Sequence, residues 1–211
     1  HVTASLGVTF YPQTEEINAD QLLRQADQAM YQVKLSGKNR FHVYDIEQDR
    51  ALRGQHESIE RIREGLNKHE FLLYYQPKVN MTTGEVVGVE ALIRWQHPQK
   101  GLCSPAAFLP IIEEHLLSIE MGDWVIEAVL TQSSLWRANG VQLPVSINIG
   151  ALQIQQTDFV TKLSELLRKF PDVPSGDIEL EVLETSALED VAQTSKVIRD
   201  CIHLGVQVSI D

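Results

Sequence analysis

Three segments in the second half of the chain alternate between aliphatic and polar residues. They are Val145–Ile149, Ile178–Leu183 and Val206–Asp211. A period of two predicts β-strands that each have one apolar and one polar face. Helix-like segments separate the three strands, so we expect them to pair in parallel through right-handed helical crossovers. This pattern constrains the fold more than any other feature of the chain.

The polar face of these strands distinguishes between two α/β architectures. An open sheet covered by helices on both sides needs apolar residues on both faces. In a barrel, one face packs against helices and the other lines a lumen that is partly polar near an active site. The alternation therefore favours a (β/α) barrel over a doubly wound sheet.

The remaining elements of this region follow from periodicity and from turn residues. A strand at Phe71–Val79, a turn at Met81–Glu85 and a strand at Val87–Trp95 predict an antiparallel hairpin. Apolar residues at helical spacing predict the helices that follow, which are Pro105–His115, Glu120–Ala138, Asp158–Phe170 and Leu188–Leu204.

The strand Val87–Trp95 carries an acid and a base on one face. Glu90 and Arg94 are four residues apart, so their side chains lie on the same side of the pleat. A carboxylate that can hold a metal beside an arginine that can hold a phosphate suits phosphoryl chemistry. The same pattern also fits an edge strand with a solvated, charged face.

An acid or an amide falls late in each of four strands. Because the carboxyl ends of barrel strands form the active-site face, we expect these side chains to converge there. Their oxygen atoms suit Mg²⁺, Mn²⁺ or Ca²⁺ rather than zinc. Any one of them also fits a turn that begins where the strand ends. The candidate metal ligands are Glu90, Asn148, Glu181 and Asp211.

Composition excludes several function classes. The formal net charge is −11, which argues against broad nucleic-acid binding. No apolar run approaches the length of a membrane span. The seven histidines show no HExxH or paired spacing, so zinc is disfavoured. Cys103 and Cys201, which form no CxxC, are expected to be free thiols in a reducing compartment.

The first 45 residues are too few for an independent core and predict a strand–helix–strand piece of a larger domain. Residues 26–40, ADQAMYQVKLSGKNR, resemble the closing segment of GGDEF diguanylate cyclase domains, with Lys34 and Lys38 at its two basic positions. The loop that names that family is absent, so the resemblance implies no cyclase activity here. Residues 46–56 are expected to be a helical or loosely ordered linker, and residues 57–211 a second domain.

That second domain carries motifs with a more specific resemblance. Glu90–Trp95 reads EALIRW, preceded by YQPK at residues 75–78 and followed by GLCSPAAFLPIIE at residues 101–113. SINIG at residues 146–150 and LEVLET at residues 180–185 come next, in order. Together these motifs resemble EAL domains, which hydrolyse the bacterial second messenger cyclic di-GMP.

The resemblance implies a (β/α)8 TIM-type barrel whose first strand is antiparallel to the rest. It implies Mg²⁺ or Mn²⁺ at Glu90, Asn148, Glu181 and Asp211, and hydrolysis of cyclic di-GMP to linear pGpG. Arg94 would hold a ligand phosphate, Gln76 would line the guanine side, and Leu92 would join them in binding substrate. Glu184 would support catalysis by anchoring the loop after the next strand, without binding the metal.

The resemblance also sets expectations about the whole protein. We expect a cytoplasmic location, a membrane connection only through parts outside this chain, and a homodimer formed through the EAL domain. The family pattern continues past Asp211, so we expect a partial barrel that is inactive by itself. Leu183 and Gly150 replace the usual Thr and Ser. A degenerate EAL domain that binds cyclic di-GMP without cleaving it is the alternative function.

Overall fold

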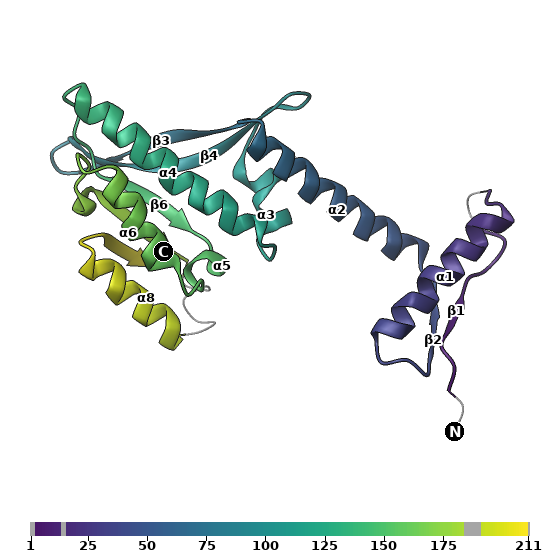
Figure 1. The fold of residues 1–211 in the computed structure, drawn as a ribbon. Coiled ribbons are helices and arrows are strands. Elements are labelled where there is room, and N and C mark those ends of the chain that lie inside the picture. Colours follow the sequence, from purple (N-terminus) through teal and green to yellow (C-terminus); the bar gives the residue numbers. More distant parts are fainter. Residues whose placement is uncertain (1–2, 14–15, 184–190, 211) are drawn as a thin grey trace. The chain divides into compact units, whose positions relative to one another are not determined.

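The computed structural model describes residues 3–13, 16–183 and 191–210. The chain divides into two compact units, His1–Glu57 and Ser58–Asp211 (Figure 1). Among the described residues, no helix is both long enough and apolar enough to cross a membrane.

The first unit is a small α/β element. Strands β1 (Leu6–Val8) and β2 (Phe41–Val43) pair in parallel, and α1 (Ala19–Leu35) connects them. The side chain of Asn18 accepts a hydrogen bond from the backbone N–H of Gln21, and the Gln21 side chain accepts one from Asn18 N, which forms a capping box at the helix start. The strand–helix–strand arrangement is the one that the sequence predicts.

A long helix, α2 (Ile46–Asn67), follows directly. Its first turn is capped by Asp45, whose Oδ1 accepts hydrogen bonds from the backbone N–H groups of Glu47 and Gln48 at 2.9 and 3.0 Å. The segment 46–56, predicted to be a helical or loosely ordered linker, is therefore helical.

The second unit is built on one mixed sheet in the order β3-β4-β6-β7-β8, and β5 (Gly101–Cys103) pairs with β4. β3 (Phe71–Val79) and β4 (Val86–His97) form the antiparallel hairpin. The strands that follow pair in parallel, as β6 (Val145–Ile149), β7 (Ile178–Val182) and β8 (Gln207–Ile210). The predicted α/β class, with an antiparallel first strand followed by parallel strands, is confirmed.

Helices cover one face of this sheet. Figure 1 shows α4 (Leu117–Ala138), α6 (Phe159–Lys169) and α8 (Val191–His203) along that face, and the four-residue α5 (Ala151–Ile154) follows β6. Short 3₁₀ turns lie at Pro105–Ala107 and Ser175–Asp177.

The segment 105–115 differs from the single helix that its apolar spacing predicts. It forms the 3₁₀ turn and then the short α3 (Leu109–Ile112). Pro110 lacks the N–H that a continuous helix would need at this point, so the helical path restarts after Phe108. Strand β5, just before this segment, has no counterpart among the predicted elements because three residues are too few to show periodicity.

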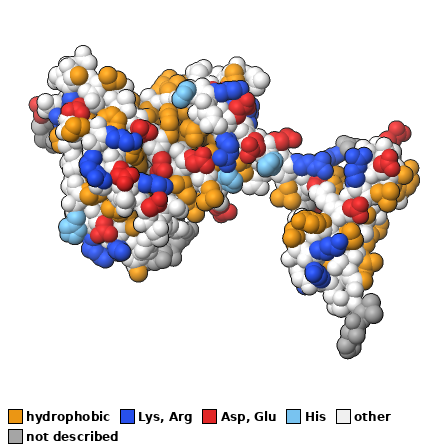
Figure 2. Space-filling view, in the orientation of Figure 1, with side chains coloured by type: hydrophobic (Ala, Val, Ile, Leu, Met, Phe, Trp, Pro, Cys, Tyr) orange, Lys and Arg blue, Asp and Glu red, His pale blue; other side chains and the backbone are white. Residues whose placement is uncertain are grey.

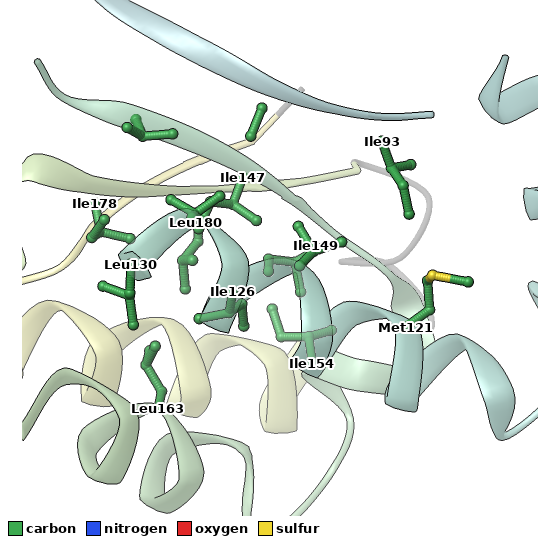
Figure 3. Packing of buried hydrophobic residues seen from close by; sticks show 14 of the residues in the cluster. Ile93, Met121, Ile126, Leu130, Ile147, Ile149, Ile154, Leu163, Ile178 and Leu180 are labelled. Carbon is green, nitrogen blue, oxygen red and sulfur yellow. The ribbon is translucent and has the colours of Figure 1, made fainter. Parts of the chain in front are cut away.

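The core lies between the sheet and these helices. The apolar strand residues Ile147, Ile178 and Leu180 are at most 1% exposed. They face Ile126 and Leu130 of α4, and Figure 3 shows these side chains interdigitating with those of α5 and α6. Because every apolar position of β6 and β7 points to this side, the polar positions all lie on the opposite face.

An ion pair ties the C-terminal part of α2 to strand β4. Glu70 Oε2 accepts hydrogen bonds from Arg61 Nη2 at 2.7 Å and from Trp95 Nε1 at 2.9 Å. The Arg61 guanidinium also lies 5.1 Å from the centre of the Trp95 ring, within cation–π range. Burial acts to raise the pKa of Glu70, but the hydrogen bonds from Trp95 and Arg61 outweigh it and lower that pKa.

This pair predicts a pH-dependent contribution to stability. Glu70→Gln keeps a hydrogen-bond acceptor but removes the charge, so at neutral pH it should lower the free energy of unfolding by about 1 kcal/mol. Because the folded-state pKa is depressed, the wild-type advantage is fully present above the ordinary glutamate pKa of about 4.3. It is lost as the pH falls through the lower folded-state value. Urea unfolding of both proteins from pH 7 to pH 3 measures this, and a difference that persists at pH 3 would contradict it.

Candidate functional site

The polar face of the sheet gathers the predicted site residues. Gln76 of β3 lies opposite Glu90 of β4 in the antiparallel register. Glu90 is in turn paired with Ser146 of β6, and Asn148 of β6 with Glu181 of β7. Since directly paired residues share a face, side chains from four strands project to the same side of the sheet.

Two of the predicted metal ligands are in direct contact. Asn148 Nδ2 donates a hydrogen bond to Glu90 Oε1 at 2.8 Å, although the two residues come from different strands. Asn148 is exposed and Glu90 is partly exposed, so both oxygen-bearing groups are accessible from the open side of the sheet. The described geometry therefore brings Glu90 and Asn148 to one point.

Glu181, the third predicted ligand, is held by a lysine. Lys78 Nζ lies 2.5 Å from Glu181 Oε1 and 3.1 Å from Glu179 Oε2. The same ammonium donates a hydrogen bond to Ser146 Oγ, and Ser146 Oγ donates one to Glu179 Oε2. One cation thus joins two carboxylates and a hydroxyl on the polar face.

The protonation of this cluster follows from its contacts. Burial acts to lower the pKa of Lys78, but the hydrogen bonds to Glu181 and Glu179 outweigh it and raise that pKa. The hydrogen bond from Ser146, helped by Lys78, lowers the pKa of Glu179 despite partial burial. At neutral pH the cluster therefore contains an ammonium and an ionised Glu179.

Arg94 lies further along the same face of β4. Its Nη1 donates a hydrogen bond to the carbonyl oxygen of Ile93 at 2.9 Å, and its guanidinium lies 5.4 Å from the centre of the Tyr74 ring. Tyr74 pairs with Leu92 in the register, so the ring and Arg94 occupy the same side of the hairpin. The described contacts give Arg94 no carboxylate partner.

A cavity of about 360 Å³ opens beside Asn148. Its lining is mostly apolar and comes from β4, the 3₁₀ turn at Pro105–Ala107, α3, α4, β6 and the residues that follow β6 and β7. Leu92 and Asn148 contribute to it, together with Pro105, Leu109, Met121 and Leu183. This volume and lining suit a flat, partly apolar group such as one nucleobase.

Two predicted residues, Glu184 and Asp211, lie outside the described residues. Within the residues that are described, no three His, Cys, Asp or Glu side chains are grouped to hold a metal. The donors that do come together are nevertheless carboxylate and amide oxygens. Their chemistry fits Mg²⁺ or Mn²⁺.

Lys78, the lysine at the centre of this face, is not among the site residues predicted from the sequence. Alternation in Ile178–Leu183 places Glu179 on the polar face with Glu181, and Lys78 shares the pleat side of Gln76, so alternation in β3 could have placed Lys78 there too. Their contact was not predictable, because β4 and β6 separate β3 from β7. In a flat sheet these strands would be about 14 Å apart, so only a strongly curved sheet brings them together.

Acidic and basic side chains are mixed on the molecular surface. Figure 2 shows Lys and Arg interspersed with Asp and Glu on both units. The net charge is −11, so this surface has no broad basic field for an anionic ligand. Such a ligand would instead be bound by individual arginine or lysine side chains.

The chain is similar to characterised signalling proteins. It is 33% identical over 211 residues to the bifunctional diguanylate cyclase/cyclic di-GMP phosphodiesterase MucR of Pseudomonas aeruginosa, covering 100% of this chain and 30% of that protein. It is 32% identical to the cyclic di-GMP phosphodiesterase PdeR of Escherichia coli, covering 100% of this chain and 32% of the relative. The chain thus spans about a third of the length of these relatives.

Solved structures show the same fold. A MucR phosphodiesterase in complex with c-di-GMP matches 74% of this chain and 63% of its own, with 33% identity and a TM-score of 0.69. The EAL enzyme Bd1971, in its cAMP and cyclic-di-GMP bound form, matches 94% of this chain and 52% of its own, with 29% identity and a TM-score of 0.73.

Family models match both parts of the chain. The model of the diguanylate cyclase GGDEF domain matches residues 1–40, and that of the EAL domain matches residues 59–211. The chain therefore belongs to the EAL domain family, and a GGDEF segment precedes its EAL region.

Proposed function

We propose that the EAL region contributes the metal-binding edge of a phosphodiesterase that hydrolyses cyclic di-GMP to linear pGpG. The observation that carries this proposal is the contact between Asn148 and Glu90, at 2.8 Å, on the face that Glu181 shares. The curated relatives named for cyclic di-GMP hydrolysis, at 33% and 32% identity, support the choice of substrate.

Three side chains of the described face would hold a divalent cation. Glu90 and Glu181 offer carboxylates, and Asn148 offers its amide oxygen once the amide turns from Glu90. A cation held there would lower the pKa of the attacking water and offset negative charge on the phosphodiester. Asp211 remains a proposed fourth ligand, and Glu184 a proposed anchor for the loop after the next strand.

The neighbouring residues would hold and orient the substrate. Arg94 has a guanidinium without a carboxylate partner among the described contacts, so it is available for a phosphate oxygen. Leu92 lines the apolar cavity of about 360 Å³ beside Asn148, where a guanine base would fit. Gln76, opposite Glu90, would offer its amide to the same base.

The division into domains is part of this proposal. We assign residues 1–45 to the GGDEF domain, residues 46–56 to the connection and residues 57–211 to the EAL domain. The homodimer through the EAL domain and the cytoplasmic location remain predictions from the sequence.

The proposal is tested with the full-length protein that contains this sequence. Incubation with cyclic di-GMP and Mg²⁺ or Mn²⁺ should yield pGpG by anion-exchange chromatography. EDTA should stop the reaction, and added Mn²⁺ should restore it. Binding of cyclic di-GMP without turnover would instead establish the receptor function, and neither binding nor turnover would refute both.

Arg94→Lys should weaken substrate binding. Lysine keeps the charge but cannot offer two parallel N–H groups to a phosphate, so we expect KM for cyclic di-GMP to rise about tenfold. Arg63→Lys, at a partly exposed helix position paired with Glu60 and Glu120, is the matched control and should leave KM unchanged. Steady-state kinetics of the full-length variants measure the effect. A KM within twofold of wild type for Arg94→Lys would count against a phosphate contact.

A further inference from the structure

The position of Lys78 on the polar face is unusual for a lysine. Its side chain reaches from β3 past β4 and β6 to two carboxylates of β7. The residue paired with it in β4 is Gly88, which has no side chain to obstruct that path. The lysine side chain is 37% exposed, whereas Glu181 is 12% exposed, so the ammonium meets a largely buried carboxylate.

The contacts fix one side of the Glu181 carboxylate. Lys78 Nζ lies 2.5 Å from Oε1 of Glu181. The ammonium also contacts Glu179 and Ser146, which each lie two residues before the predicted metal ligand of their own strand. The described hydrogen bonds leave Oε2 of Glu181 without a protein donor. A carboxylate held through one oxygen presents the other in a fixed direction.

The charges of the cluster also allow Glu181 to bind a cation while Lys78 holds its other oxygen. The ammonium lies between two carboxylates, 2.5 Å from Glu181 Oε1 and 3.1 Å from Glu179 Oε2, and Ser146 donates a hydrogen bond to Glu179. Because a second acidic side chain, Glu179, shares the ammonium, it offsets the lysine charge that would otherwise repel a cation from Glu181.

We propose that Lys78 is a positioning residue, which orients the Glu181 carboxylate so that its free oxygen binds the divalent cation. This inference rests on the proposed function, because it takes Glu181 as a metal ligand. Lys78 itself touches neither the cation nor the substrate. Glu179 supplies the counter-charge that lets an ammonium sit beside a metal ligand without repelling the metal.

The test measures Mn²⁺ binding to the full-length protein by electron paramagnetic resonance of the free ion, independently of turnover. Hydrogen-bond partners of metal ligands commonly contribute 10- to 100-fold to metal affinity. Lys78→Met should therefore raise the Mn²⁺ dissociation constant at least tenfold, and the Mn²⁺ concentration for half-maximal hydrolysis by the same factor. Lys78→Arg keeps a positively charged N–H donor for the single Glu181 oxygen that Lys78 contacts, so it should restore affinity to within about threefold of wild type.

Two further variants separate this role from general effects. Lys68→Met removes an exposed lysine that pairs only with Glu64 among the described contacts, and it should leave the dissociation constant unchanged. Glu179→Gln keeps the shape of the cluster but removes the counter-charge, so it should also weaken Mn²⁺ binding. It provides the test if Lys78→Met does not fold.

The outcomes distinguish the two levels of the proposal. Unchanged Mn²⁺ affinity in Lys78→Met and Glu179→Gln, with normal binding and hydrolysis by wild type, would overturn the role of Lys78 alone. Tighter binding in Lys78→Met would also overturn it, since the ammonium would then be a competitor of the metal. A wild-type protein that binds no Mn²⁺ would overturn both this role and the proposed function.

Discussion

Glu90→Gln is expected to lower kcat/KM for cyclic di-GMP hydrolysis by the full-length protein at least about a hundredfold. Glutamine has nearly the same shape but no charge, so it binds a divalent cation weakly and stabilises less of the charge that the reaction develops. Asn148 Nδ2 donates a hydrogen bond to Glu90 Oε1 at 2.8 Å, and the side-chain carbonyl oxygen of glutamine could accept the same bond. The fold should therefore be preserved. The Mn²⁺ dissociation constant should rise in parallel with the loss of activity.

A matched control lies on the same hairpin. Glu85→Gln removes a carboxylate from the exposed turn between β3 and β4 and should leave both activity and metal affinity unchanged. Chromatographic assay of pGpG at saturating Mn²⁺ compares the two variants with wild type. Retention of more than a tenth of wild-type activity by Glu90→Gln would remove Glu90 from the metal site.

Ile147→Ala should cause the largest loss of stability among these predictions. Ile147 is fully buried at the centre of β6, where it packs between the neighbouring strands and the helices of the covered face (Figure 3). Truncation of such a side chain removes its burial and leaves a cavity, which costs about 2–5 kcal/mol. Denaturant unfolding should show the midpoint falling with little change in slope.

The same substitution at an exposed site provides the control. Ile202 of α8 is 55% exposed, so Ile202→Ala should change the free energy of unfolding by less than about 0.5 kcal/mol. If Ile147→Ala destabilised the protein no more than Ile202→Ala does, the apolar face of β6 would not be the core of this sheet.

The sequence was sufficient to predict which strand residues face the core and which lie on the polar face. Alternation in β6 and β7 separated Ile147 and Leu180, which are buried, from Asn148 and Glu181, which are on the polar face. Periodicity works here because each strand has one face against helices and one face away from them. Apolar periodicity did not predict that the segment after β5 is divided near Pro110. The spacing of apolar residues does not register that proline lacks a backbone N–H.

The candidate site was predictable only in part, for a related reason. Glu90 and Asn148 come from adjacent strands, and Asn148 lies two residues beyond the register partner of Glu90, so local strand pairing brings them together. Lys78 and Glu181 come from strands that are not neighbours, and their contact depends on the curvature of the whole sheet. Curvature arises from the accumulated twist and packing of all the strands and has no signature in any one of them.

The most direct test of the account is anomalous diffraction from crystals of the full-length protein grown with Mn²⁺. We predict a manganese peak within about 2.0–2.6 Å of oxygen atoms of Glu90, Asn148 and Glu181. Lys78 should still hold the other oxygen of Glu181. A manganese peak at a different place would contradict the assignment of this face as the metal site. The absence of any peak, with the hydrogen bond from Asn148 to Glu90 retained, would contradict it as well.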